Sequence, residues 1–222
     1  MTVRPSTNQW IYALFIAQIV LAVMATATNV FVFKISVAGI GVVILLLLHY
    51  KQIKKEWGVW MVILALLFSI VGDYFLSHMN EDGSMFIIGI GLYLLAHIGY
   101  LLFSLFNGRI KWGFTLIITL AYLAFFYQIL YPNMSDKTLV FMVLFYLLVS
   151  CVSLGAALGI NAKGNVKWFY VLGISMILLS DTIISFKEFM DYHTIDFLIL
   201  PTYYVAQICI TIALFNKMKK WT

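Results

Sequence analysis

Long apolar segments alternate with short polar breaks along almost the whole chain. A helix that crosses a bilayer needs about 20 predominantly apolar residues, and the long segments are of that length. The breaks are short, so successive helices should be antiparallel neighbours. The first segment, with Arg4 before it and small residues at 25–27, also resembles a secretory signal, but we expect it to be kept as the first helix. The pattern predicts eight membrane-spanning helices, over residues 9–28, 31–49, 57–77, 86–106, 112–131, 138–158, 166–186 and 195–216.

The composition points to the same class of protein. The 222 residues are 64% hydrophobic and only 10% charged, and the mean hydropathy is +1.01. A soluble domain of this size could not cover its surface with so few charges. We therefore expect an all-α fold in which residues 1–222 form one integral membrane domain. The net charge of +5 does not indicate nucleic-acid binding, because the basic residues lie between apolar segments. No cofactor is indicated, and Cys151 and Cys209 are interpreted as small core residues.

The charges in the breaks predict the orientation of the bundle, because cytoplasmic loops of membrane proteins carry an excess of Lys and Arg. The breaks after the second, fourth and sixth helices and the C-terminal tail are basic, which predicts that both termini are cytoplasmic. Lys34, on the outer side, is the exception. The short loops favour a bacterial cytoplasmic membrane. The basic residues are Lys51, Lys54, Lys55, Arg109, Lys111, Lys163, Lys167, Lys217, Lys219 and Lys220, and the opposite breaks carry Glu81, Asp82, Asp136, Lys137, Lys187, Glu188, Asp191 and Asp196.

A faint internal repeat relates the two halves of the chain. Asp73 and Asp181 are 108 residues apart, and the spacings Tyr93-x3-His97 and Tyr203-x3-Gln207 are 110 apart. A repeat of four helices would give both halves the same orientation. A parallel 4+4 duplication is therefore one interpretation, and chance similarity between apolar helices is the other.

Two lone aspartates inside apolar segments are the most informative residues of the chain. Asp73 lies in LALLFSIVGDYFLS and Asp181 in LGISMILLSDTIIS. A carboxylate at membrane depth costs about 2.5–3.5 kcal/mol even on the insertion scale, and it usually faces a protein interior or an aqueous cavity. Both aspartates lie near the predicted outer ends of their helices. We therefore expect a functional site that opens to the outer side.

Other polar residues are also predicted to lie in the outer half of the bilayer, and those of each helix fall on one face of that helix. His97 and Gln207 are predicted to be near the middle of the membrane, and Lys34 is near the outer start of the second helix. These faces predict a central polar cavity that opens outward. The candidate substrate-binding residues are Asn29, Lys34, Tyr93, His97, Ser180, Tyr204 and Gln207.

Each of these features also has a purely structural interpretation. Small and polar stripes, including Gly155-x3-Gly159, often only pack membrane helices together. His97 is equally compatible with a hydrogen-bonded structural role. Lys34 is equally compatible with a side chain that extends outward from its helix end and with one that neutralises an aspartate. A second aspartate would still be unexplained, which favours a functional role for the pair.

Paired carboxyl groups suit a specific chemistry. Two nearby buried carboxyls cannot both ionise easily, so one tends to act as an acid and the other as a base. Such a division suits hydrolysis without a metal or a covalent intermediate. The sequence contains neither G-x-S-x-G nor H-E-x-x-H. A zinc site built from His97, the aspartates and a loop histidine is the alternative.

The motifs in register resemble one known family. The runs LLFSIVGDYFLS and FIIGIGLYLLAHIGYLLF resemble the GD-then-F-x2-G…H-x2-Y core of the YhhN/TMEM86 family. The runs ILLSDTIISFKEF and YYVAQICI resemble its second aspartate and its A-Q signature. FKISVAGIGVVILLL resembles its helix-2 lysine segment, although Ile35 stands where the family usually has proline. The first, fifth and sixth helices match only in hydropathy.

This resemblance implies lysoplasmalogenase activity, in which the vinyl ether of a 1-alkenyl-glycerophosphoethanolamine or -choline is cleaved to a fatty aldehyde and a glycerophospho-alcohol. Asp73 and Asp181 would then be the catalytic pair, one as proton donor and the other as the group that orients water. Lys34 would bind the lipid phosphate or tune an aspartate, and the other candidate residues would position the head group. No metal is implied.

Two further functional classes compete with this interpretation. A small proton-coupled carrier would also use intramembrane Asp and His residues as proton-relay groups, but no clearly broken helix pair is apparent. A structural scaffold would leave both aspartates unexplained. The head group, the chain length and the oligomeric state cannot be predicted from the sequence.

Overall fold

The computed structural model describes residues 7–49, 56–79, 83–162 and 164–218. Several of the charges used above to predict orientation lie outside these residues, as does the charge ahead of the first helix. These are Arg4, Lys51, Lys54, Lys55, Glu81, Asp82, Lys163, Lys219 and Lys220.

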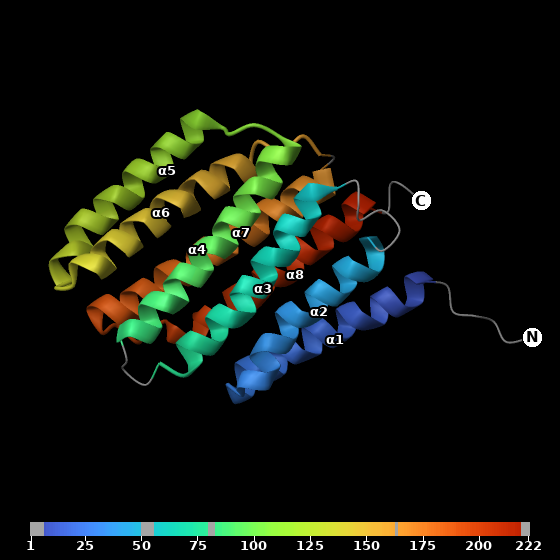
Figure 1. Cartoon of the computed structure of the whole chain (residues 1–222), viewed down its shortest axis with the longest axis horizontal. Helices are drawn as coiled ribbons and strands as arrows, with labels where there is room; N and C mark the ends of the chain where they lie inside the picture. The colour runs from blue at the N-terminus through green and yellow to red at the C-terminus, as the bar shows by residue number, and fades with distance from the viewer. Residues whose placement is uncertain (1–6, 50–55, 80–82, 163, 219–222) are drawn as a thin grey trace, which may run out of the picture.

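The described residues form an all-α bundle, as expected, with eight helices long and apolar enough to cross a membrane. The eight helices are shown in Figure 1. They are α1 (Thr7–Thr28), α2 (Phe31–His49), α3 (Trp57–Ser77), α4 (Gly83–Asn107), α5 (Trp112–Phe125), α6 (Lys137–Ala157), α7 (Gly164–Met190) and α8 (Ile199–Met218).

Two predicted spans differ from the structure in their details. The fifth span is not one regular helix, because α5 ends at Phe125 and continues as a π-helical turn, Phe126–Leu130, and a 3₁₀ turn, Tyr131–Asn133. Pro132 lies in the 3₁₀ turn and has no N–H to continue an α-helix. The seventh span is longer than predicted, because the helix continues past the apolar segment to polar residues such as Lys187 and Glu188.

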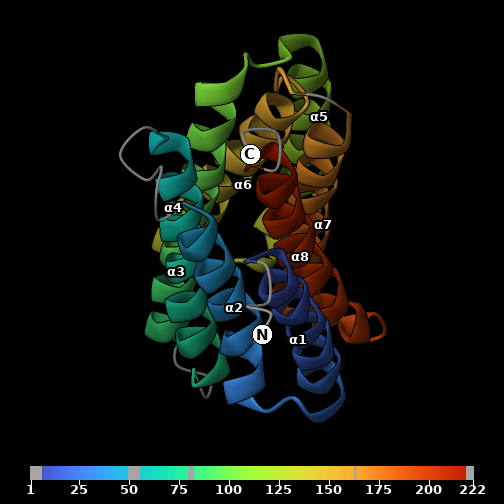
Figure 2. The same ribbon diagram turned by 90° about the vertical axis from the view of Figure 1, so that its right-hand side faces the viewer.

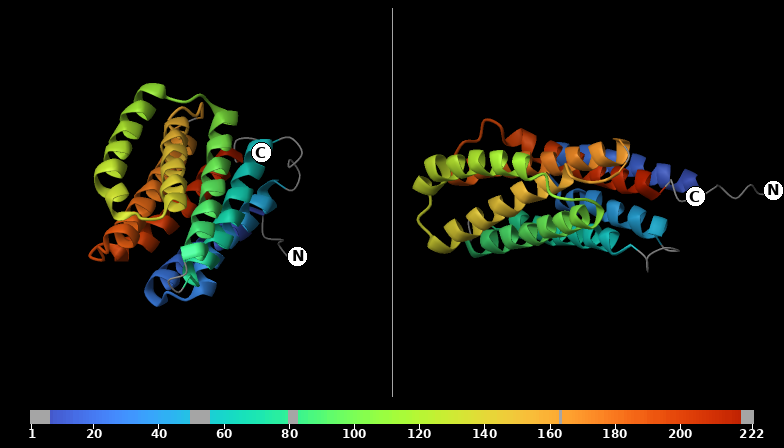
Figure 3. Two further views of the ribbon diagram at one scale, coloured as in Figure 1. Left: turned by 60° about the vertical axis from the view of Figure 1, so that its left-hand side comes forward. Right: turned by 90° about the horizontal axis from the view of Figure 1, so that it is seen from above.

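Most consecutive helices pack as antiparallel neighbours, and the most extensive pairs are α3 with α4 and α7 with α8. The expectation fails for α4 and α5, because both helices pack mainly on α6 rather than on each other. Helices α4 and α8 are central, since α4 also packs on α6 and α8 also packs on α1 and α2. Helices α5 and α1 lie on opposite flanks of the bundle, as the views in Figure 2 and Figure 3 also show. The first residues of α1 and the last residues of α8 lie at the same end of the bundle.

Small residues allow the two main pairs to approach closely. A Cβ atom at Gly99 of α4 would lie 2.6 Å from the carbonyl oxygen of Met61 in α3. In the other pair, a Cβ atom at Gly173 of α7 would lie 3.0 Å from the carbonyl oxygen of Ala206 in α8. The main hydrophobic core lies between these four helices, is completed by residues of α2 and α6, and includes the fully buried Tyr100 and Tyr170.

Polar contacts connect the helices at the end of the bundle where α1 begins and α8 ends. Lys217 Nζ of α8 lies 2.7 Å from Glu56 Oε2 and 2.8 Å from Asn107 Oδ1, which joins the ends of α3, α4 and α8. On the neighbouring side, Gly108 and Ile160 form an isolated antiparallel bridge. The cytoplasmic placement of this end and the 4+4 duplication stay predictions.

We expect Gly159→Ala to destabilise the protein. Its Cβ would collide with the carbonyl oxygen of Arg109 in the connection between α4 and α5, and overpacking of this kind costs about 1–3 kcal/mol. The measurement is the unfolding midpoint of the purified protein in detergent. Gly113→Ala is the control, because nothing lies within 4 Å of a Cβ at that position. Equal midpoints for the two variants would contradict the prediction.

Candidate functional site

A polar cavity of about 380 Å³ lies at the end of the bundle where α3 and α7 end and α2, α4 and α8 begin. Its wall combines residues from segments far apart in the sequence. The polar lining consists of Asn29, Lys34, Asp73, Ser77, Tyr93, Ser180, Asp181, Lys187, Glu188, Asp196 and Tyr203. The structure therefore places both aspartates on the wall of one cavity.

Asp73 lies on α3 and is only 6% exposed. The hydroxyl of Tyr93, from α4, donates a hydrogen bond to Asp73 Oδ1. Gly72 makes this approach possible, because a Cβ there would lie 3.0 Å from the Tyr93 ring. The Tyr203 ring, from α8, packs edge-on against Tyr93 at 6.0 Å. Among the described residues, Asp73 Oδ2 has no hydrogen-bond partner, so this oxygen is available to carry a proton.

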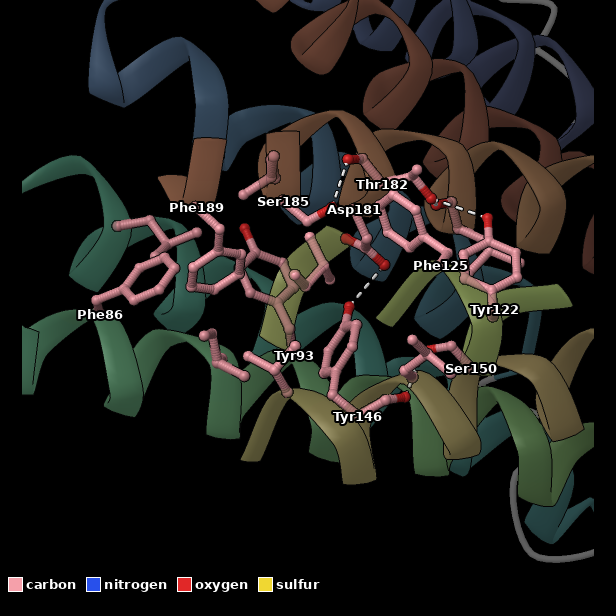
Figure 4. Close-up of a pocket in the computed structure, with 17 residues that line it drawn as sticks. Phe86, Tyr93, Tyr122, Phe125, Tyr146, Ser150, Asp181, Thr182, Ser185 and Phe189 are labelled. Atoms are coloured by element: carbon pink, nitrogen blue, oxygen red, sulfur yellow. Dashed lines mark hydrogen bonds between the residues drawn. The ribbon is translucent and has the colours of Figure 1, made fainter. Parts of the chain in front are cut away.

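Asp181, on α7, is held by two groups from other helices. The Tyr146 hydroxyl of α6 donates to Asp181 Oδ2 at 2.6 Å (Figure 4), and His97 Nε2 of α4 lies 3.1 Å from the same oxygen. The His97 ring also packs edge-on against Tyr146 at 5.0 Å. Side chains from α4 and α6 therefore converge on one carboxyl oxygen of Asp181.

The remaining candidate residues on the wall have local structural contacts as well. Lys34 Nζ lies 3.5 Å from Ser77 Oγ, so within the described part of the chain it pairs with a hydroxyl and makes no ion pair with an aspartate. Asn29 ends α1 in the left-handed region at φ 56°, which asparagine tolerates better than most residues. Ser180 donates to the carbonyl oxygen of Ile199 at 3.1 Å and joins α7 to the start of α8.

Three of the predicted site residues do not line the cavity. His97 is 1% exposed and reaches it through Asp181. Gln207 is fully buried, and neither of its amide atoms has a partner among the described residues. Tyr204 is 2% exposed and packs with Ala22, Ala25 and Val37. The substrate-binding roles of these residues stay predictions.

The structure adds residues to the site that the sequence analysis did not select. Tyr203 is on the wall beside its selected neighbour Tyr204, and the correspondence of Tyr203-x3-Gln207 with Tyr93-x3-His97 was a signal that could have identified it. Tyr146 holds Asp181, but α6 offered only hydropathy for comparison. Lys187, Glu188 and Asp196 had been assigned only to the orientation of the chain. Lys187 and Glu188 become wall residues because α7 extends beyond its apolar segment, and Asp196 reaches the wall from the 3₁₀ turn Asp196–Leu198 before α8.

The described residues offer no group of three His, Cys, Asp or Glu side chains arranged to hold a metal ion. His97 and Asp181 are adjacent, but the zinc alternative would need further ligands. His193, in the connection between α7 and α8, contacts two other carboxylates, Asp196 and Asp191.

At the mouth of the cavity, His193 bridges two aspartates. Its Nδ1 lies 2.8 Å from Asp196 Oδ2, and its Nε2 lies 2.9 Å from Asp191 Oδ1. These bonds hold the connection between α7 and α8. Hydrogen bonds to Asp196 and Asp191 raise the pKa of His193 above its ordinary value, because both contacts favour the protonated ring.

We expect His193 to titrate above the ordinary histidine pKa, and Asp196→Asn to lower that pKa. Because the folded-state pKa is raised, the contribution of this contact to stability is present below the ordinary pKa and is lost as the pH rises through the raised value. Ring-proton NMR of the histidine-labelled protein measures the titration. An unshifted His193 in the unmodified protein would contradict the geometry.

Comparison with known proteins gives one match. The sequence model of the YhhN family matches residues 31–214, from the start of α2 into α8. No curated protein and no solved structure is significantly similar to the chain.

Proposed function

The chain belongs to the YhhN family, and we propose that it is a membrane-embedded lysoplasmalogenase. In this proposal it hydrolyses the vinyl ether of 1-alkenyl-glycerophosphoethanolamine or -choline and releases a fatty aldehyde and a glycerophospho-alcohol. The observation that carries the proposal is that Asp73 and Asp181 line one cavity while different tyrosines hold them. Family membership alone is compatible with a hydrolase and does not specify the reaction.

The environments of the two carboxyls support different roles. Asp181 accepts a hydrogen bond from Tyr146 and lies next to His97, a second polar side chain on the same oxygen. Asp73 is more deeply buried, and one of its oxygens has no hydrogen-bond partner among the described residues. We assign Asp73 as the proton donor and Asp181 as the base.

The reaction follows from these roles. Asp73 transfers its proton to the β-carbon of the vinyl ether, which leaves an oxocarbenium ion at the carbon bonded to oxygen. Water adds to that carbon while Asp181 takes one of its protons, and a hemiacetal forms. In the collapse, Asp73 recovers a proton from the hemiacetal hydroxyl, and Asp181 returns its proton to the departing glycerol oxygen. The aldehyde and the alcohol leave, and both carboxyls regain their starting states.

The rest of the wall suits the polar part of a lysophospholipid. Lys34 is positioned to bind the phosphate, since its nearest described partner is the Ser77 hydroxyl, and Lys187 is already paired with Glu188 at 3.0 Å. Tyr93, Tyr203, Asn29 and Ser180 line the space that would hold the glycerol and the water.

Asp73→Asn and Asp181→Asn are each expected to lower aldehyde release by about 10²–10⁴-fold, because each removes one proton-transfer group. Purified protein in lipid nanodiscs is incubated with a 1-alkenyl lysophospholipid, and aldehyde is quantified. Asp136→Asn is the matched control. Its carboxylate caps α6 by accepting from the Thr138 N–H and does not line the cavity. Full activity in either variant would refute the assigned chemistry, and substrate-dependent proton flux without aldehyde would favour the carrier.

Adjacent tyrosines provide a second test of the site. Tyr203→Phe is expected to raise the KM for the lysolipid about fivefold, as loss of one hydrogen bond to the glycerol does. Tyr204→Phe should leave it within about twofold, because only Tyr203 lines the cavity. Steady-state kinetics of the two variants measure the difference. The reverse pattern would favour Tyr204, the residue selected from the sequence.

A further inference from the structure

A second pocket, of about 90 Å³, lies beside the polar cavity, and we call it the side pocket. Figure 4 shows its lining, which comes mainly from α4, the end of α5, α6 and α7. Most of these side chains are apolar, and they include Phe86, Phe125, Leu147 and Phe189. Along α7 the lining runs from residue 178 to residue 189, which corresponds to roughly 16 Å of helix axis at 1.5 Å per residue.

The side pocket and the polar cavity meet at the catalytic residues. Both are lined by Tyr93 and Asp181, together with Leu76, Phe86 and Ile184. One elongated molecule can therefore occupy both spaces, with its polar end in the cavity and its apolar end in the side pocket. The bond between the two ends would then lie beside Asp181.

The side pocket borders the flank where the bundle is held together least. Helix α5 packs along α6 but makes only sparse contact with α7. The seam between α5 and α7 is bridged by the Tyr122–Thr182 hydrogen bond at 2.8 Å and by the edge-on Phe125 and Phe186 rings at 5.3 Å. Tyr122, Phe125 and Thr182 are only half-buried. A spanning bundle would present this seam to lipid chains.

We propose that the side pocket binds the hydrocarbon chain of the lysophospholipid, which enters from the bilayer between α5 and α7. This inference rests on the proposed function and names the place where that substrate holds its chain. A hydrocarbon chain is the occupant that fits, because the pocket is apolar, narrow enough for one chain, continuous with the polar cavity and next to the membrane. Leu147, 6% exposed on the pocket wall, limits the space available to that chain.

The test uses a 1-O-alkyl lysophospholipid, whose saturated ether has no double bond to protonate. Binding to the full-length protein in nanodiscs is measured for a series of chain lengths, separately from turnover of the vinyl ether. Leu147→Trp should weaken binding of the longest chain by at least about tenfold and have little effect on the shortest. Phe145→Trp is the matched control, because Phe145 is 45% exposed and does not line the pocket.

A second variant, with a smaller side chain at the same position, keeps the proposal testable if Leu147→Trp does not fold. Leu147→Ala enlarges the pocket, so it should shift the preferred chain to a longer one. Unchanged chain-length profiles in both variants, with unfolding midpoints like that of the unmodified protein, would overturn the proposal. If the variants cleave the vinyl ether and their chain-length profiles are unchanged, the proposal for the side pocket is refuted and the proposed hydrolase activity stands. If binding depends on chain length as expected but no aldehyde is released, the side pocket is supported as a chain-binding site and the proposed hydrolase activity is refuted.

Discussion

The constraint on which the structure depends is that hydrocarbon provides no hydrogen bonds to polar groups. It accounts for the helical form of every described span, because a helix satisfies its own backbone. It also determines where the aspartates lie. Asp73 and Asp181 face one internal cavity, and each accepts hydrogen bonds from neighbouring helices. The carboxyls and their donors therefore act as fixed points that orient α3, α4, α6 and α7 relative to one another.

Close packing of the helices gives the two aspartates different surroundings. Glycines bring α4 against α3 and α7 against α8, so Tyr93 reaches Asp73 from the partner helix of its own pair. Asp181 has a different arrangement, because its donors come from α4 and α6. If the chain did arise by duplication, its two aspartates have acquired different surroundings. That difference is what an acid and a base require of two identical side chains.

The two connected spaces match the two parts of an amphiphile. A polar cavity whose wall includes Lys34 suits an anionic head group, and an apolar pocket beside the seam between α5 and α7 suits a chain. Tyr93 and Asp181 lie where the two spaces meet. A vinyl ether links the chain of a lysoplasmalogen to its glycerol, so a substrate held in both spaces would present that bond to the carboxyls. The π-helical turn at the end of α5, a feature often found at functional sites, adjoins the pocket through Leu130.

The sequence by itself determined the eight spans and their approximate ends, and it singled out the two aspartates inside apolar helices, because hydropathy and the cost of a buried carboxyl are local properties. It also identified part of the polar wall, including Lys34, Tyr93 and Ser180. Only the tertiary structure showed that Tyr146 and His97 hold Asp181, that Tyr203 rather than Tyr204 lines the cavity, and that a side pocket adjoins it. The physical reason is that lipid and protein interior are both apolar. An apolar pattern therefore does not reveal which face of a helix turns inward or which helix it meets there.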